Sequence, residues 1–178
     1  MLEGENSLIK KAQGGEAASF GDLYDHYSKP IYRYVFLKTS HKSLAEDITH
    51  EVFLSAWQNI NNYSFQGFPF SSWLYQIARN RVIDHYRTRK ELINLDDLEE
   101  KNVELVNQSD FQIDQNLTME KIKAGLSNLP EDQKDVIIMR FINDLSTPEI
   151  SSIINKSEGA VRLIQHRAIA NLKKILND

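Results

Sequence analysis

Apolar residues recur at steps of three and four along most of the chain, the period of helices that bury one face. The clearest case covers residues 70–87, directly after the chain breakers Gly67 and Pro69. Its apolar positions are Phe70, Trp73, Leu74, Ile77, Ala78, Val82 and Tyr86. Ser71 or Ser72 is a candidate cap. We predict an amphipathic helix here.

The residues before this helix predict further helices. Residues 7–13 form a short one that the glycines at 14–15 stop. A longer helix follows, and we expect Pro30 to interrupt it so that a second helix restarts there. The stretch Ser43-Leu-Ala-Glu46 has the spacing of a capping box, which predicts a helix from there to about Gln58.

The C-terminal part of the chain is also helical by pattern. Helices are predicted over about 117–127, from Leu129-Pro130 onward, over 148–154 and over about 157–176. The second takes its core from Val136, Ile137, Met139, Phe141 and Ile142. A second capping box (residues 146–149) precedes the short helix, and Asn155 favours a tight left-handed turn after it. This spacing is typical of a helix-turn-helix; a plain helical hairpin with surface charges is the alternative.

Residues 90–117 lack a sustained period. Residues 90–118 carry eight acidic and two basic side chains, while the flanking segments are close to neutral. We predict an all-α fold of two small helical domains, 1–89 and 118–178, joined by a flexible acidic linker over 90–117.

Composition excludes several classes. The chain has no cysteine, and hence no disulfide, thiolate zinc site or cysteine nucleophile. It has no glycine-rich phosphate loop, its histidines are scattered, and we expect no enzyme, metal or cofactor. The N-terminus is polar and no long apolar run occurs, so we expect a cytoplasmic protein without membrane insertion.

Three surfaces are candidates for binding. Asp47, His50, Glu51 and Leu54 share one side of a helix, which is either an ordinary solvated face or a docking surface for a basic partner. The loop over 60–69 is rich in aromatics, which either cover the core or surround an unstacked base. The outer side of the 70–87 helix mixes cations, amides and rings: Tyr75, Arg79, Asn80, Asp84 and Arg87. Such a mixture suits nucleic acid, although a solvated face is the simpler interpretation.

Several motifs together resemble one family. Asp47-Ile-Thr-His-Glu-Val-Phe-Leu-Ser-Ala-Trp57, Phe70-Ser-Ser-Trp-Leu-Tyr-Gln-Ile-Ala-Arg-Asn80 and Asp84-x-x-Arg87 resemble domain two of bacterial RNA polymerase sigma factors of the extracytoplasmic-function (ECF) class. The C-terminal part, with Leu145-Ser-Thr-Pro-Glu-Ile and Gly159-Ala-Val-Arg-x-x-Gln-His-Arg-Ala168, is similar to domain four of that class.

The resemblance implies a transcription initiation factor whose partners are core RNA polymerase, promoter DNA and an anti-sigma protein. It implies docking on the clamp helices of the polymerase through Asp47, His50, Glu51 and Leu54. It assigns the minus-ten element to Asn62, Tyr63, Phe65, Phe68, Tyr75, Arg79, Asn80 and Arg87. It assigns the minus-thirty-five element to Lys156, Ser157, Glu158, Arg162, Gln165, His166 and Arg167. The alternatives are a stand-alone helix-turn-helix regulator and a helical interaction protein.

Overall fold

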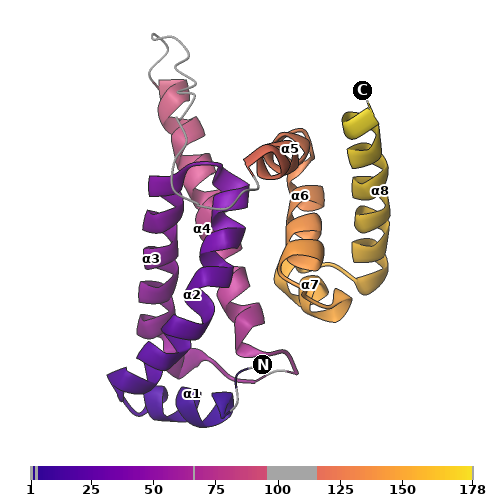
Figure 1. Ribbon diagram of the computed structural model, residues 1–178. Coiled ribbons are helices and arrows are strands. Elements are labelled where there is room, and N and C mark those ends of the chain that lie inside the picture. Colours follow the sequence, from indigo (N-terminus) through magenta and orange to yellow (C-terminus); the bar gives the residue numbers. More distant parts are fainter. Residues whose placement is uncertain (1, 3, 66, 96–115, 178) are drawn as a thin grey trace.

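The computed structural model describes residues 2, 4–65, 67–95 and 116–177. These residues form helices and turns and contain no strand, which confirms the all-α class. The N-terminal bundle comprises α1 (Glu5–Gln13), α2 (Ala17–Thr39), α3 (Lys42–Asn59), the 3-10 turn η1 (Ile60–Asn62) and α4 (Phe70–Leu95). The C-terminal bundle comprises α5 (Asn116–Ser127), α6 (Glu131–Ile137), the π-helical turn η2 (Ile138–Ile142), α7 (Thr147–Ile154) and α8 (Glu158–Asn177). Figure 1 shows the two bundles side by side, with α7 against α4.

The segment predicted as a linker is only partly described. Helix α4 continues through Leu95, beyond the predicted end near residue 90, because strong helix formers follow without a glycine or proline. Helix α5 begins at Asn116. The remainder of the predicted linker, residues 96–115, lies outside the described residues.

The N-terminal bundle buries one face each of α2, α3 and α4. Side chains with no more than 3% exposure fill its centre: Leu23, Ile31, Val35, Ile48, Val52, Phe70, Leu74, Ala78 and Val82. Most of the predicted apolar face of α4 is therefore core. Tyr86 is 41% exposed instead. Figure 1 shows that α4 rises beyond the ends of α2 and α3.

The predicted break at Pro30 is wrong, because α2 runs without interruption through this residue. Proline removes one helical hydrogen bond and costs about 3 kcal/mol in a helix interior. Tyr27, Ile31 and Tyr34 surround it on the buried face of α2. Burying side chains of this size contributes about 1.5–3 kcal/mol each, which offsets the missing bond.

The start of α3 also differs from its prediction. His41 is the N-cap, and its Nδ1 accepts a hydrogen bond from the Leu44 backbone N–H at 3.2 Å. Ser43 therefore lies in the first turn rather than capping it. Ser71 and Ser72 likewise lie within the first turn of α4, which begins at Phe70. In each case the helix starts one or more residues before the serine that the pattern favoured.

Helix α1 fastens the loop that follows α3. Gln13 Nε2 donates hydrogen bonds to the backbone oxygens of Ile60 and Tyr63, both at 2.9 Å. One amide thus holds both ends of η1. The ring of Tyr63 then packs against Phe70 and Trp73, with centroids 5.1 and 5.2 Å away. The shape of the aromatic loop therefore depends on a residue nearly fifty positions earlier.

The C-terminal bundle contains the predicted helix-turn-helix. Ser146 and Glu149 form the capping box of α7, and Asn155 ends that helix with a φ of 53°, as predicted. Ser157 Oγ accepts from the Ala160 N–H and caps α8. The prediction that Phe141 is core is wrong, since it is 53% exposed. Phe141 lies within the π-helical turn η2, whereas Ile138 and Met139 of the same turn are buried.

We predict that Ser146→Ala lowers the free energy of unfolding of the chain by about 1 kcal/mol, because it removes the cap of α7. Urea denaturation followed by circular dichroism measures the change. Ser43→Ala is the matched control and is expected to be nearly neutral, since His41 caps α3. Equal losses in both variants would contradict the assignment of the caps.

We also predict that Gln13→Met, which keeps the side-chain length, loosens η1 at a cost of about 1 kcal/mol. Hydrogen exchange is the measurement, and the backbone amide of Tyr63, which bonds to the Ile60 oxygen, is expected to exchange faster. Gln58→Met, on the exposed surface of α3, is the control. Unchanged exchange at Tyr63 would show that Gln13 does not hold the loop.

Candidate functional site

The predicted docking residues lie together on the exposed side of α3. Asp47, His50, Glu51 and Leu54 are all exposed, opposite the buried side that carries Ile48. The Leu54 side chain is 57% exposed beside the two carboxylates. A large apolar residue in water next to charges of one sign is typical of a surface that binds another protein.

The aromatic loop borders a hollow of about 240 Å³. The lining residues are Asn62, Tyr63, Ser64, Phe68, Pro69, Ser72, Trp73, Gln76 and Ser152. The hydroxyl oxygen of Ser72 is buried and has no hydrogen-bond partner among the residues that the structure describes. Phe65 is not among the lining residues and stands 63% exposed. The hollow offers aromatic surfaces and amide and hydroxyl groups, which are the groups that hold an unstacked base.

The outer side of α4 divides into an exposed and a covered part. Asn80 and Arg87 are exposed, and Arg87 pairs with Asp84 at 3.2 Å. Tyr75 is only 3% exposed, and its hydroxyl accepts from Asn143 Nδ2 at 2.6 Å. Burial raises the pKa of Tyr75. The pattern predicted an exposed tyrosine here, but the C-terminal bundle packs on this side of α4.

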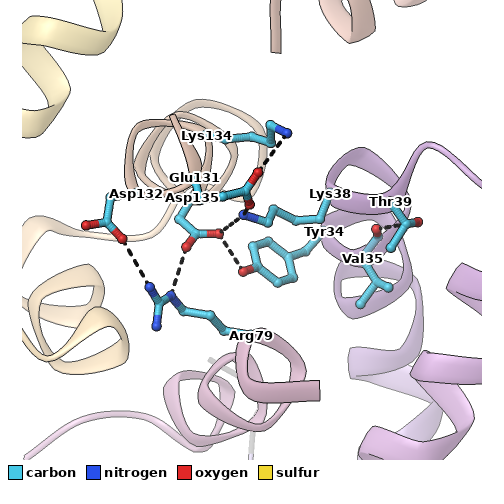
Figure 2. A network of polar contacts seen from close by, with 9 residues as sticks. All are labelled: Tyr34, Val35, Lys38, Thr39, Arg79, Glu131, Asp132, Lys134 and Asp135. Atoms are coloured by element: carbon cyan, nitrogen blue, oxygen red, sulfur yellow. Dashed lines mark hydrogen bonds and ion pairs between the residues drawn. The ribbon is translucent and has the colours of Figure 1, made fainter. Parts of the chain in front are cut away.

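Arg79 is covered by the same contact. Figure 2 shows its guanidinium between two carboxylates of α6, with Nε 2.8 Å from Asp135 Oδ2 and Nη2 3.2 Å from Asp132 Oδ1. Burial alone lowers the pKa of Arg79, but the adjacent Asp135 carboxylate outweighs this and the pKa is raised. The arginine therefore stays charged, and its Nε and Nη2 donate to carboxylates of α6.

Two further residues of α2 reach the same carboxylate (Figure 2). The Tyr34 hydroxyl donates to Asp135 Oδ1 at 2.8 Å, and Lys38 Nζ lies 2.8 Å from that oxygen. Burial, together with the Asp135 charge, raises the pKa of Tyr34. Lys38 also pairs with Glu131 at 2.5 Å. Burial raises the pKa of Glu131, but this lysine outweighs it and the pKa is lowered.

The helix-turn-helix presents most of its predicted residues to solvent. Lys156, Ser157, Glu158, Arg162, His166 and Arg167 are exposed, and Gln165 is half-buried. Arg162 Nη2 donates to Glu158 Oε2 at 2.8 Å within α8. Lys156 Nζ lies 3.3 Å from Asp132 Oδ2. All but Gln165 are therefore available at the surface of the first turns of α8.

Sequence reasoning missed the residues that join the two bundles. Asp135 precedes the apolar residues Val136, Ile137 and Ile138, and Lys38 lies on a side of α2 with the apolar residues Ile31 and Val35. The usable signal in the sequence is a charged residue at a position where the neighbours are apolar, because such residues are rarely buried without a partner. That signal identifies the residues but not which carboxylate meets which cation.

Neither a membrane-spanning helix nor a metal cluster occurs in the described part of the chain. None of its helices combines the length and apolar character needed to cross a bilayer. None of its groups of histidine, aspartate and glutamate is arranged to hold a metal ion.

The chain matches two family profiles. Residues 23–91 match Sigma-70 region 2, and residues 125–174 match Sigma-70 region 4. The first covers most of the N-terminal bundle and the second most of the C-terminal bundle.

Individual relatives of the chain belong to the same family as the two profiles. The chain is 34% identical over 172 residues to the ECF RNA polymerase sigma factor BldN of Streptomyces coelicolor, covering 96% of this chain and 65% of BldN. It thus spans about two thirds of the length of that relative. It is 32% identical over 179 residues to the ECF RNA polymerase sigma factor SigW of Bacillus subtilis, covering 96% of this chain and 95% of SigW.

Solved structures show the same fold. CnrH, solved in complex with the cytosolic domain of CnrY, superposes with a TM-score of 0.76 at 21% identity, over 97% of both chains. The sigma factor RpoE of Bartonella quintana, solved with the anti-sigma factor NepR, gives 0.74 at 20% identity, over 89% of this chain and 96% of RpoE. The profiles, the relatives and the fold agree, and the chain belongs to the ECF class of RNA polymerase sigma factors, which are transcription initiation factors.

Proposed function

We propose that the chain binds core RNA polymerase, directs it to a restricted set of promoters and opens the minus-ten element. The observation that carries this proposal is that one chain presents three distinct surfaces: the acidic face of α3, the hollow beside the aromatic loop and the exposed start of α8. The protein binds and positions; it does no covalent chemistry.

The α3 face is the proposed docking surface for the clamp helices of the largest polymerase subunit. Asp47 and Glu51 supply negative charge for a basic partner surface. Leu54 supplies apolar area that is exposed to water in the free chain. Charge complementarity guides the encounter, while burial of the leucine stabilises the complex. His50 lies between them on the same face.

The hollow is the proposed site for an unstacked base of the non-template strand. Flipping a base out of a duplex costs a few kcal/mol, and stacking on aromatic rings is worth about 1–3 kcal/mol per base. Asn62, Tyr63 and Phe68 line the hollow, and Phe65 of the same loop is exposed. Asn80 is exposed on α4 and adds an amide that can bond base edges.

The start of α8 is the proposed reader of the minus-thirty-five duplex. A recognition helix places its N-terminal residues against base edges in the major groove. Arg162 suits a guanine and Gln165 an adenine, while Lys156 and Arg167 suit phosphates. The Glu158–Arg162 pair is exposed, and such pairs contribute only about 0.3–0.5 kcal/mol, so DNA can replace it readily.

The domain organisation completes the proposal. The N-terminal bundle, with α4 extended to Leu95, is the proposed minus-ten and docking domain, and the C-terminal bundle from Asn116 is the proposed minus-thirty-five domain. The acidic segment between them is the proposed linker. An anti-sigma protein is a proposed further partner, and the proposed site of action is the cytoplasm.

Run-off transcription on promoter fragments from the source organism tests this proposal. We predict specific transcripts only when core RNA polymerase and the chain are both present. Asp47→Arg with Glu51→Arg is expected to abolish them and to abolish co-purification with core, because the docking charge is reversed. Asp22→Arg with Asp25→Arg reverses two exposed carboxylates of α2 and is the control.

Two results would refute this assignment. Retained polymerase binding by the α3 variant would refute the docking face. Tight duplex binding by the free chain without any effect on core polymerase would favour a stand-alone helix-turn-helix regulator instead.

We further predict that Arg162→Ala relaxes the base preference of the minus-thirty-five duplex by about 1–3 kcal/mol, because a bidentate contact to guanine discriminates by that amount. Competition binding of holoenzyme to duplexes substituted at single positions measures this. A uniform loss across all sequences, with a lower salt dependence, would show that Arg162 contacts a phosphate.

A further inference from the structure

The outer side of α8 carries a large apolar residue, Leu163, which is 49% exposed. Leu163 is not a member of the predicted minus-thirty-five set. Val161 and Ala168, which belong to the core of the C-terminal bundle, are both fully buried. At 3.6 residues per turn, these two lie about 160° and 140° around the helix from Leu163. Leu163 therefore lies on the side of α8 that is opposite the core.

The neighbours of Leu163 on this side of α8 are small or polar. Gly159, His166 and Arg167 lie within about 60° of Leu163 around the helix, and all three are exposed. Arg162, which directly precedes it, is also exposed. A single exposed leucine is ordinary on a protein surface. The position of this one, between two arginines in the first turns of the proposed recognition helix, is what points to a ligand.

Gly159 leaves open space one turn before Leu163. A side chain built on Gly159 would meet no atom nearer than Ser157 Oγ, at 4.0 Å from its Cβ. Packing among the described residues therefore does not require a glycine at this position. The missing side chain does allow another molecule to approach the backbone of α8 closely beside the leucine.

The charge around Leu163 favours duplex DNA as that molecule. Arg162 and Arg167 are exposed cations on either side of the leucine, and Lys156 lies just before the helix. A stable protein interface buries about 800 Å² on each partner, far more than one leucine among cations offers. In the major groove, by contrast, one apolar group suffices, because thymine presents a single C5-methyl group there.

We propose that Leu163 is a specificity-determining residue, which packs on the C5-methyl group of a thymine in the minus-thirty-five element. This inference rests on the proposed function, because it adds a base reader to the helix that is proposed to enter the duplex. Cytosine at the same position lacks the methyl group and presents its N4 amino group instead. The leucine would cover that amino group without accepting its hydrogen bond, which disfavours cytosine. The chain thus selects promoters that carry thymine at this position.

Replacement of thymine by deoxyuridine tests the inference, because it removes the methyl group and leaves the O4 acceptor and the base pairing in place. The holoenzyme, which is the chain bound to core RNA polymerase, first selects its preferred sequence from promoter duplexes randomised over the minus-thirty-five region. Each thymine of the selected sequence is then replaced in turn by deoxyuridine. Competition against the unmodified duplex measures the change in affinity.

We expect one of these replacements to weaken binding of the wild-type holoenzyme about fourfold, which is the effect of one buried methyl group. Leu163→Ala is expected to bind the thymine and deoxyuridine duplexes equally, since it lacks the side chain that contacts the methyl group. Ile122→Ala is the matched control, because Ile122 is an apolar residue of the same bundle that is 38% exposed on α5. This control is expected to keep the fourfold difference.

Three results would overturn the inference. If no deoxyuridine replacement weakens binding of the wild-type holoenzyme, the chain reads no thymine methyl group. If Leu163→Ala retains the fourfold difference, a different residue reads it. If the holoenzyme selects no minus-thirty-five sequence, the proposed function of α8 fails together with the inference. Selection of a sequence that is insensitive to deoxyuridine removes only the role of Leu163 and leaves the proposed function in place.

Discussion

The Asp135 carboxylate is the contact on which the arrangement of the molecule depends. This carboxylate is a buried charge, and the contacts that stabilise it come from a lysine, an arginine and a tyrosine. Such a site has a strict geometry, since any shift between the bundles leaves a buried ion without a partner. Through these contacts a single acidic residue joins α6 to both α2 and α4.

This constraint involves one of the proposed promoter contacts. Arg79, one of the two cations that pair with the Asp135 carboxylate, lies on α4 and belongs to the predicted minus-ten set. The acidic face of α3 and most of the start of α8 remain exposed when the two bundles are in contact. The proposed docking and duplex-reading surfaces are therefore accessible in this arrangement. Of the proposed minus-ten residues, Tyr75 and Arg79 are covered, while Asn80 and Arg87 are exposed.

The sequence predicts local structure well where one short motif determines it. Ser146 with Glu149, the left-handed Asn155 and the cap at Ser157 all form as their spacing indicates. Predictions failed where packing overrode local preference: Pro30 is held inside α2 by the buried residues around it, and His41 caps α3 in place of Ser43. The covered positions of Tyr75 and Arg79 were not predictable from α4 alone, because residues about sixty positions later, Asp135 on α6 and Asn143 just after η2, contact them.

The arrangement of the two bundles is tested by measuring the distance between them in the free chain and in its complex with core polymerase. Spin labels on Lys10→Cys and Lys174→Cys report this distance by electron paramagnetic resonance. We expect a single short distance for the free chain and a distinctly longer one on the polymerase. The same distance in both states would contradict it, because the Asp135 contact would then persist while the promoter is open.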